Sequence, residues 1–319
     1  MNVQDVLSDN YDVGTVQDVA SIKSGVSNQN YRIATTTGEY VLRVCHFEPQ
    51  NQVNVMLPFL EYAATVDYPA PRLVKTANGQ GFYGTEDEPV IVTTVVDGDS
   101  GTYEGINDDQ LVSLGASLAR LHKLAWNPQE GSKTNNTTYI LDVYNQFSGA
   151  EIEDSPENKD FLDVLEQDYR LFSSAHMQAE LGMLPTGLIH NDLIPDNVLF
   201  KDDTVASFVD LEEIGQGIML LDIARVLNSW CFVNGEPQAD RMAAFLKSYN
   251  ESRPLTSEEV DMLPVAMHFV SFRNSVFGLK MLAQKRIATI SESKDYPHLQ
   301  YVRANQDLLS EMIKHSLQE

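Results

Sequence analysis

The chain has few cysteines, few cations and no long apolar stretch, and each shortage excludes a class of protein. It contains only two cysteines, Cys45 and Cys231, which are far apart and form no CxxC pair. This argues against a disulfide scaffold or a zinc site and predicts a reducing, cytoplasmic compartment. No apolar run approaches the roughly 18 residues that a membrane-spanning helix needs. The first residues are polar and lack an apolar core, so we expect no signal peptide.

The charge balance narrows the choice of partners. Lys and Arg total 22 against 46 Asp and Glu, which gives a formal net charge of -24. Nucleic acids and anionic membranes attract proteins through basic patches, so we expect neither as a partner. With 43% hydrophobic residues over 319 positions and no low-complexity tract, the chain has the composition of a globular protein of one large domain or two lobes.

The most informative stretch, residues 188–210, places polar residues between apolar strands. An apolar pair leads into His190 and Asp192, and Asn197 follows five residues after Asp192. A second apolar strand ends at Asp210. Two adjacent strands would bring Asp192, Asn197 and Asp210 to one end of a hairpin. One acid would then accept a hydroxyl proton, and two oxygen ligands would suit magnesium, so the pattern predicts phosphoryl transfer. The alternative is a polar turn with His190 as a structural histidine.

The spacing H-x-D-x-x-x-x-N with a downstream Asp is that of the protein-kinase catalytic loop, except that Asn191 stands in the second place. In this form it resembles the aminoglycoside phosphotransferase and choline kinase superfamily, the small-molecule branch of the kinase fold. The resemblance implies that Asp192 is the catalytic base and that Asn197 and Asp210 bind magnesium.

The same resemblance implies an α+β fold of the bilobal, protein-kinase-like type. We expect a small antiparallel-sheet N-lobe over residues 1–96 and a mainly helical C-lobe over residues 97–319. ATP and Mg²⁺ are the implied cofactors, held in the cleft between the lobes. Because the chain has few cations, we expect magnesium to neutralise much of the phosphate charge.

A small-residue loop lies in the strand-rich pattern of residues 16–44. In the kinase fold this loop covers the nucleotide phosphates. The residues expected to bind them are Ser24, Gly25, Ser27, Asn28 and Asn30. Taken alone, the loop is an ordinary hairpin connection.

Two further nucleotide contacts follow from the resemblance. Arg43 lies on the third strand, where kinases carry the lysine that pairs with the ATP phosphates; a surface-exposed arginine is the alternative. The helix expected over residues 52–66 has no acid at the matching place, so the partner of Arg43 stays unassigned. The apolar strand over residues 89–96 matches the hinge, where backbone groups of Thr94 and Val96 would bind adenine.

The resemblance also implies that two residues support the catalytic loop. His190 is assigned a structural role, and Asp222, at the opening of a predicted helix, is expected to hold the loop backbone by hydrogen bonds. A helix N-terminal Asp with no further role is the alternative.

Several stretches resemble the homoserine kinases of this fold, among them residues 25–31, 190–200 and 227–232. Homoserine kinases usually carry aromatic residues after the metal-binding Asp, whereas this chain has Glu212 and Glu213. Paired acids suit an ammonium group, although they are equally typical of a solvated loop. A carboxylate on the substrate would require a cation, for which Arg273 or Arg225 is available; a salt bridge to the acid-rich surface is the alternative.

The sequence therefore predicts an ATP- and Mg²⁺-dependent kinase that phosphorylates a hydroxyl of a small metabolite, with homoserine as the first choice. One alternative is a kinase of choline, ethanolamine, a sugar or an aminoglycoside. The other is a catalytically silent nucleotide-binding module, which the missing helix acid and the sparse phosphate loop would favour. The sequence makes no prediction of oligomeric state.

Overall fold

The computed structural model describes residues 2–22, 28–46, 49–126, 134–135 and 137–318. The chain divides into two compact units, which we call the sheet unit and the helical unit. The sheet unit comprises residues 1–101, 124–133 and 196–215, and the helical unit comprises residues 102–123, 134–195 and 216–319. The lobe boundary expected after residue 96 stays a prediction.

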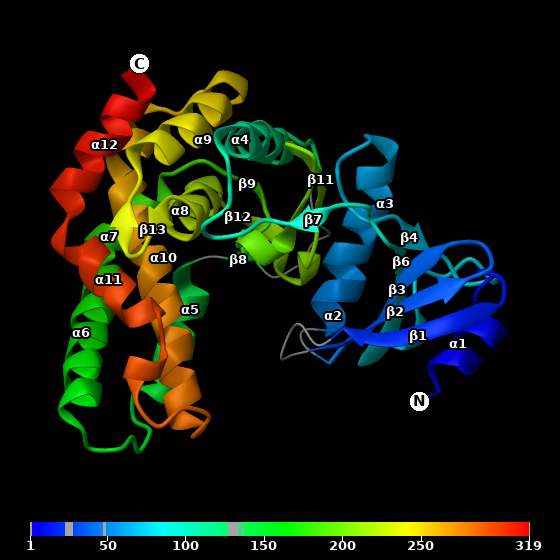
Figure 1. Cartoon of the computed structure of the whole chain (residues 1–319). Coiled ribbons are helices and arrows are strands. Elements are labelled where there is room, and N and C mark those ends of the chain that lie inside the picture. Colours follow the sequence, from blue (N-terminus) through cyan, green and yellow to red (C-terminus); the bar gives the residue numbers. More distant parts are fainter. Residues whose placement is uncertain (1, 23–27, 47–48, 127–133, 136, 319) are drawn as a thin grey trace. The chain divides into compact units, whose positions relative to one another are not determined.

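The sheet unit is built on one antiparallel sheet with the order β1-β2-β3-β6-β4, and β5 pairs with β6 (Figure 1). Its strands are β1 (Val16–Ile22), β2 (Gln29–Thr35), β3 (Glu39–Val44), β4 (Leu73–Val74), β5 (Tyr83–Thr85) and β6 (Glu88–Thr94). Side chains alternate between the two faces of a strand. Leu42, Val44 and Val92 are buried in one core with Val6 and Leu7 of α1 (Val3–Asn10). The intervening residues, Arg43 among them, point to the opposite face.

The same unit contains a second, three-stranded sheet with the order β11-β10-β7. It consists of β7 (Asp99–Ser100), β10 (Val198–Lys201) and β11 (Thr204–Phe208). The turn between β10 and β11 includes Asp202 at φ 53°, a conformation that Asp tolerates better than most residues. The predicted hairpin that carries Asn197 and Asp210 at its ends is therefore present.

The segment expected to be one helix over residues 52–66 is composite. It consists of α2 (Pro49–Asn51), a π-helical turn over Gln52–Met56, and α3 (Leu57–Thr65). π-Helical turns often occur at functional sites because the wider turn re-aims side chains. Here Gln52 is fully buried at the start of that turn.

The helical unit holds most of the helices. Its elements before the catalytic loop are α4 (Asp108–His122), β8 (Thr134–Asn135), α5 (Thr137–Phe147), α6 (Pro156–Phe172), α7 (Ala175–Gly182) and β9 (Thr186–Ile189). Those after it are β12 (Gly215–Ile218), α8 (Met219–Trp230), β13 (Phe232–Val233), β14 (Glu236–Pro237), α9 (Ala239–Ser252), α10 (Ser257–Ala283), α11 (Asp295–Ala304) and α12 (Gln306–Gln318). The strands β8, β12 and β9 form a small sheet in that order.

The helix α10 is central, since α5, α6, α8, α11 and α12 all pack against it (Figure 1). A capping box lies at its start, in which the side chains of Thr256 and Glu259 each accept the other's backbone N–H. The helix begins at Ser257 and continues through Pro264 into an apolar stretch. The cap and the apolar stretch thus belong to one helix. No helix within the described residues combines the length and apolar character that crossing a membrane requires.

Candidate active site

The loop that carries the H-N-D sequence follows β9 in the helical unit. Asn191 has φ 71°, in the left-handed region that asparagine and glycine enter more readily than other residues. The backbone therefore explains why asparagine stands between His190 and Asp192. His190 is fully buried, and its Nδ1 accepts the backbone N–H of Asp192 at 3.3 Å.

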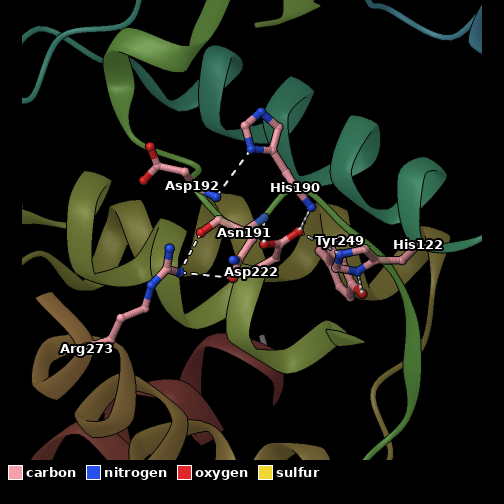
Figure 2. A network of polar contacts seen from close by, with 7 residues as sticks. All are labelled: His122, His190, Asn191, Asp192, Asp222, Tyr249 and Arg273. Carbon is pink, nitrogen blue, oxygen red and sulfur yellow. Dashed lines mark hydrogen bonds and ion pairs between the residues drawn. The ribbon is translucent and has the colours of Figure 1, made fainter. Parts of the chain in front are cut away.

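The buried carboxylate of Asp222 anchors this loop (Figure 2). Its Oδ2 accepts the backbone N–H of His190 at 2.7 Å, and its Oδ1 accepts that of Asn191 at 2.8 Å. The side chain has no exposed surface, so two charge-assisted hydrogen bonds offset the cost of burying it. The residue that was expected to hold the loop backbone thus makes two hydrogen bonds to it.

A second contact to Asp222 comes from α4. His122 Nε2 lies 3.3 Å from Oδ2 of Asp222, and His122 Nδ1 lies 2.7 Å from the hydroxyl of Tyr249 on α9 (Figure 2). Burial lowers the pKa of His122 and outweighs the opposing effect of Asp222. Sequence reasoning missed Tyr249, because nothing local to α9 distinguishes it from an ordinary core tyrosine.

Two arginines contact the loop from the helices behind it. Arg225 on α8 donates from Nη2 to Oδ1 of Asp192 at 2.7 Å. Arg273 on α10 donates from Nη1 to the carbonyl oxygen of Asn191 at 2.6 Å and to its Oδ1 at 3.0 Å (Figure 2). Burial acts to raise the pKa of Asp192, but Arg225 and Arg273 together hold it below its ordinary value. Asp192 is therefore ionised at neutral pH. Arg273, which was expected to contact the substrate, donates hydrogen bonds to the loop. Its contact with substrate stays a prediction.

The loop is also held at its far side. The indole Nε1–H of Trp230, at the end of α8, donates to the carbonyl oxygen of Leu193 at 3.0 Å. Trp230 is fully buried. Residues 190–193 are thus tied to α8 at both ends, by Asp222 and by Trp230.

The expected magnesium ligands lie in the sheet unit. The backbone N–H of Val209 donates to the carbonyl oxygen of Asn197 at 2.9 Å, which closes the base of the hairpin. Asp210 follows with φ 57° and ψ 52°, a left-handed conformation at the residue that ends the strand. Strained backbone of this kind clusters at functional sites.

Arg43 and Asp210 form an ion pair of 3.0 Å between Nη2 and Oδ1. Arg43 also donates from Nε to Oδ1 of Asn30, its neighbour on β2, at 3.1 Å. Asp210 is thus the acidic partner of Arg43 that the sequence left unassigned. The two residues are 167 positions apart, so no local pattern pointed to the pair.

Glu212 is held by hydrogen bonds from other residues of the sheet unit. Its Oε2 accepts hydrogen bonds from the side-chain amides of Asn28 and, at 3.4 Å, Gln52, and its backbone oxygen accepts from Asn51 at 2.8 Å. Burial, followed by the charge of Asp210, raises the pKa of Glu212 to about 8. Glu213 is half-buried. Contact of either acid with substrate stays a prediction.

A cavity of about 400 Å³ lies within the sheet unit. Arg43, Thr94 and Val96, expected at the nucleotide, line it together with Asp210, the expected magnesium ligand, and Leu199. The backbone N–H of Thr94 already donates to the carbonyl oxygen of Arg72 at 2.9 Å.

The expected phosphate loop is described only in part. Ser24, Gly25 and Ser27 lie outside the described residues. Asn28 and Asn30, which are described, bond to Glu212 and Arg43.

The donor set suits a magnesium ion shared with phosphates. Among the described residues no three His, Cys, Asp or Glu side chains cluster as a metal site. Asn197 and Asp210 offer oxygen ligands only, and Asp210 retains 35% of its side-chain exposure. Magnesium is commonly bound through one or two carboxylates together with substrate phosphates and water, so this pair fits that ion better than a cage of protein ligands would.

Comparisons with known proteins agree on one family. The profile of the phosphotransferase enzyme family (APH) matches residues 18–255. The homoserine kinase of Methylobacillus flagellatus is 28% identical over 287 residues, which cover 89% of this chain and 86% of that protein. The homoserine kinase of Polaromonas naphthalenivorans is 29% identical over 294 residues, covering 91% and 90%.

Solved structures show the same fold at low identity. A choline/ethanolamine kinase family protein from Mesorhizobium loti has a TM-score of 0.67 at 14% identity and covers 94% of this chain and 92% of that one. A spectinomycin phosphotransferase in complex with ADP and spectinomycin has a TM-score of 0.60 at 12% identity, covering 98% and 97%. The predicted α+β, kinase-like fold class is confirmed. Because the family profile spans most of the chain, from the first strand to the end of α9, this protein belongs to the phosphotransferase enzyme family.

Proposed function

We propose that the protein is an ATP- and Mg²⁺-dependent kinase that transfers the γ-phosphoryl group to a hydroxyl of a small metabolite, with homoserine as the acceptor. The observation that carries this proposal is the double hydrogen bond from the loop backbone to Asp222, immediately before Asp192. These hydrogen bonds fix the backbone beside the ionised carboxylate of Asp192. Phosphoryl transfer requires mainly such positioning and charge neutralisation.

In this proposal each of the described site residues has a separate role. Asp192 orients the acceptor hydroxyl and takes its proton late, as the bond to phosphorus forms, so a base with a lowered pKa is sufficient. Asn197 and Asp210 would hold magnesium, which supplies charge neutralisation of the phosphates when bound. Arg43, which pairs with Asp210 in this structure, would bind the nucleotide phosphates. Thr94 and Val96 line the cavity in which we place adenine.

One observation supports homoserine over the other acceptors. Two relatives that match this chain along most of its length are homoserine kinases. The competing acceptors belong in the test because the fold is shared with a choline/ethanolamine kinase family protein and a spectinomycin phosphotransferase.

The test is ADP release, measured with a coupled assay, in the presence of ATP and Mg²⁺ and one acceptor at a time. The acceptors are homoserine, choline, ethanolamine, methylthioribose, a hexosamine and an aminoglycoside. The Asp192→Asn variant serves as the blank, with its folding checked by thermal unfolding. Removing a general base costs about 10²- to 10⁴-fold in rate, so the blank should show almost no turnover.

Homoserine-dependent turnover that disappears in the blank would support the full proposal. Preference for another acceptor would retain the kinase and replace the substrate. Nucleotide binding without turnover on any acceptor, in the wild type as in the blank, would favour the silent module.

A further inference from the structure

Arg225 donates a hydrogen bond to the side chain of Asp192, and Asn274 holds Arg225 from a second direction. Nη2 donates to Oδ1 of Asp192 at 2.7 Å, and Nη1 donates to Oδ1 of Asn274 on α10, also at 2.7 Å. The side chain of Arg225 is only 13% exposed. We propose that Arg225 is a positioning residue that fixes the orientation of the Asp192 carboxylate. This inference rests on the proposed function, in which Asp192 takes the hydroxyl proton.

The position of Arg225 on α8 explains how it can do this. Arg225 lies three residues after Asp222, and residues at this spacing share one face of a helix. The same face of α8 therefore contacts the loop twice. Asp222 accepts the backbone N–H groups of the loop, and Arg225 donates to the side chain of Asp192, the next residue. One rigid helix sets both the path of the loop and the direction of its carboxylate.

Asn274 makes the contact directional. A guanidinium held at one nitrogen only can swing about its long side chain. With the second nitrogen held by Asn274, the planar group is fixed between α8 and α10, which pack against each other. Lysine would supply the charge but not this two-point geometry, because its ammonium is a point charge on a flexible stem.

The charges around Asp192 show that Arg225 is not its only cation. Arg273 on α10 also lowers the pKa of Asp192, and His190 adds a smaller effect in the same direction. The nearby acid Asp222 accepts hydrogen bonds from the loop backbone. On α11, burial and then Arg225 lower the pKa of His298 to about 4, so His298 is neutral at neutral pH. Loss of Arg225 would thus leave Arg273 and His190 beside Asp192 but remove the hydrogen bond that orients its carboxylate.

The test compares three variants with the wild type in the steady state. Arg225→Gln removes the charge and the anchor, Arg225→Lys keeps the charge alone, and Asn274→Ala keeps the guanidinium but releases one end. A misplacement of a catalytic group by about 1 Å costs on the order of 10²-fold in rate. We expect kcat to fall by about that factor in Arg225→Gln, with the acceptor KM changed much less. In Arg225→Lys and Asn274→Ala, kcat should fall by a smaller factor.

The pH profile separates the two effects of Arg225. Because Arg225 lowers the pKa of Asp192, its removal raises that pKa and moves the acid limb of kcat/KM to higher pH. Arg225→Lys and Asn274→Ala should keep the wild-type limb while kcat is reduced. A purely structural role would leave the limb unchanged in every variant.

Arg253→Gln is the matched control. Arg253 pairs with the buried Glu259 at 2.9 Å and has the same 13% side-chain exposure, but it has no described contact with the loop. It should lose stability and keep the wild-type kcat and pH profile. Arg225→Gln with wild-type kcat and profile, or losses of kcat that follow Tm equally in both variants, would overturn the role of Arg225 alone. A wild-type enzyme without turnover on any acceptor would overturn the proposed function together with this role.

Discussion

Arg43 Nη2 lies 3.0 Å from Oδ1 of Asp210, and this ion pair joins the third strand to the end of the catalytic hairpin. Each partner is expected to have a different contact during the reaction, since Arg43 is assigned to phosphates and Asp210 to magnesium. In the proposed function, the pair would keep these two opposite charges matched before the nucleotide and magnesium bind.

Arg43→Gln should weaken MgATP binding by about 10- to 100-fold, since hydrogen bonds to charged groups contribute about 1.5–3 kcal/mol. Arg43→Lys should recover part of the loss, because a lysine retains the charge without the forked geometry. Isothermal titration with a non-hydrolysable ATP analogue and Mg²⁺ measures both. Arg72→Gln, which breaks a surface ion pair of 2.8 Å in the same unit, is the control and should bind as the wild type does. Equal affinity in Arg43→Gln and the wild type would remove Arg43 from the nucleotide site.

Asp222→Asn should destabilise the protein by about 3 kcal/mol. The carboxylate is fully buried and accepts two backbone N–H groups, and an amide can present only one oxygen to them. Urea unfolding followed by tryptophan fluorescence gives the free energy of unfolding. Asp108→Asn changes an exposed first-turn Asp of α4 and should cost at most about 1 kcal/mol. If the two variants lost the same stability, Asp222 would be an ordinary helix N-terminal Asp.

Features set by neighbouring residues were predictable from the sequence. The capping boxes at Asn107 and Thr256 follow from a Ser/Thr/Asn three residues before Gln or Glu, and both are present. The H-N-D loop was recognisable because its spacing is local, and the φ of Asn191 adds the physical reason for its composition. Its catalytic role stays a prediction.

Contacts between distant segments were not predictable. Arg43 with Asp210, Arg225 with Asp192, and His122 with Tyr249 join residues that no periodic pattern links. The composite helix after residue 49 was missed for a similar reason, because a π-helical turn depends on tertiary contacts rather than on propensity. The burial of Gln52 in this turn is likewise visible only in the structure.

Gly115→Ala should destabilise the protein by about 1–3 kcal/mol, the usual cost of overpacking. A Cβ at Gly115 would lie 2.5 Å from the carbonyl oxygen of Phe245 and 3.0 Å from the backbone nitrogen of Tyr249, so α4 and α9 would have to separate. Gly182→Ala is the control, because nothing lies within 4 Å of its Cβ and it ends a helix. That variant should be neutral or more stable by up to about 1 kcal/mol. Thermal unfolding of the two variants compares them, and a stable Gly115→Ala would show that the two helices can move apart at little cost.

Glu212→Gln should change how stability depends on pH. Burial and the charge of Asp210 raise the pKa of Glu212 to about 8, well above the value of an exposed glutamate in the unfolded chain. Between these two values the folded protein keeps a proton that the unfolded chain has released, so this carboxyl makes the protein less stable as pH rises towards 8. A single proton limits the slope to about 1.4 kcal/mol per pH unit.

The measurement is the free energy of unfolding in urea from pH 5 to pH 9, for the wild type and Glu212→Gln side by side. Subtracting the two curves removes the other titrating groups. We expect the stability of the wild type relative to the variant to fall as pH rises and to level off above pH 8, because glutamine keeps an oxygen for Asn28 and Gln52 without a proton to lose. Glu213→Gln removes the neighbouring carboxyl and tests the origin of the slope. If it altered the curve as much as Glu212→Gln does, the net charge of the segment, rather than the burial of Glu212, would be responsible.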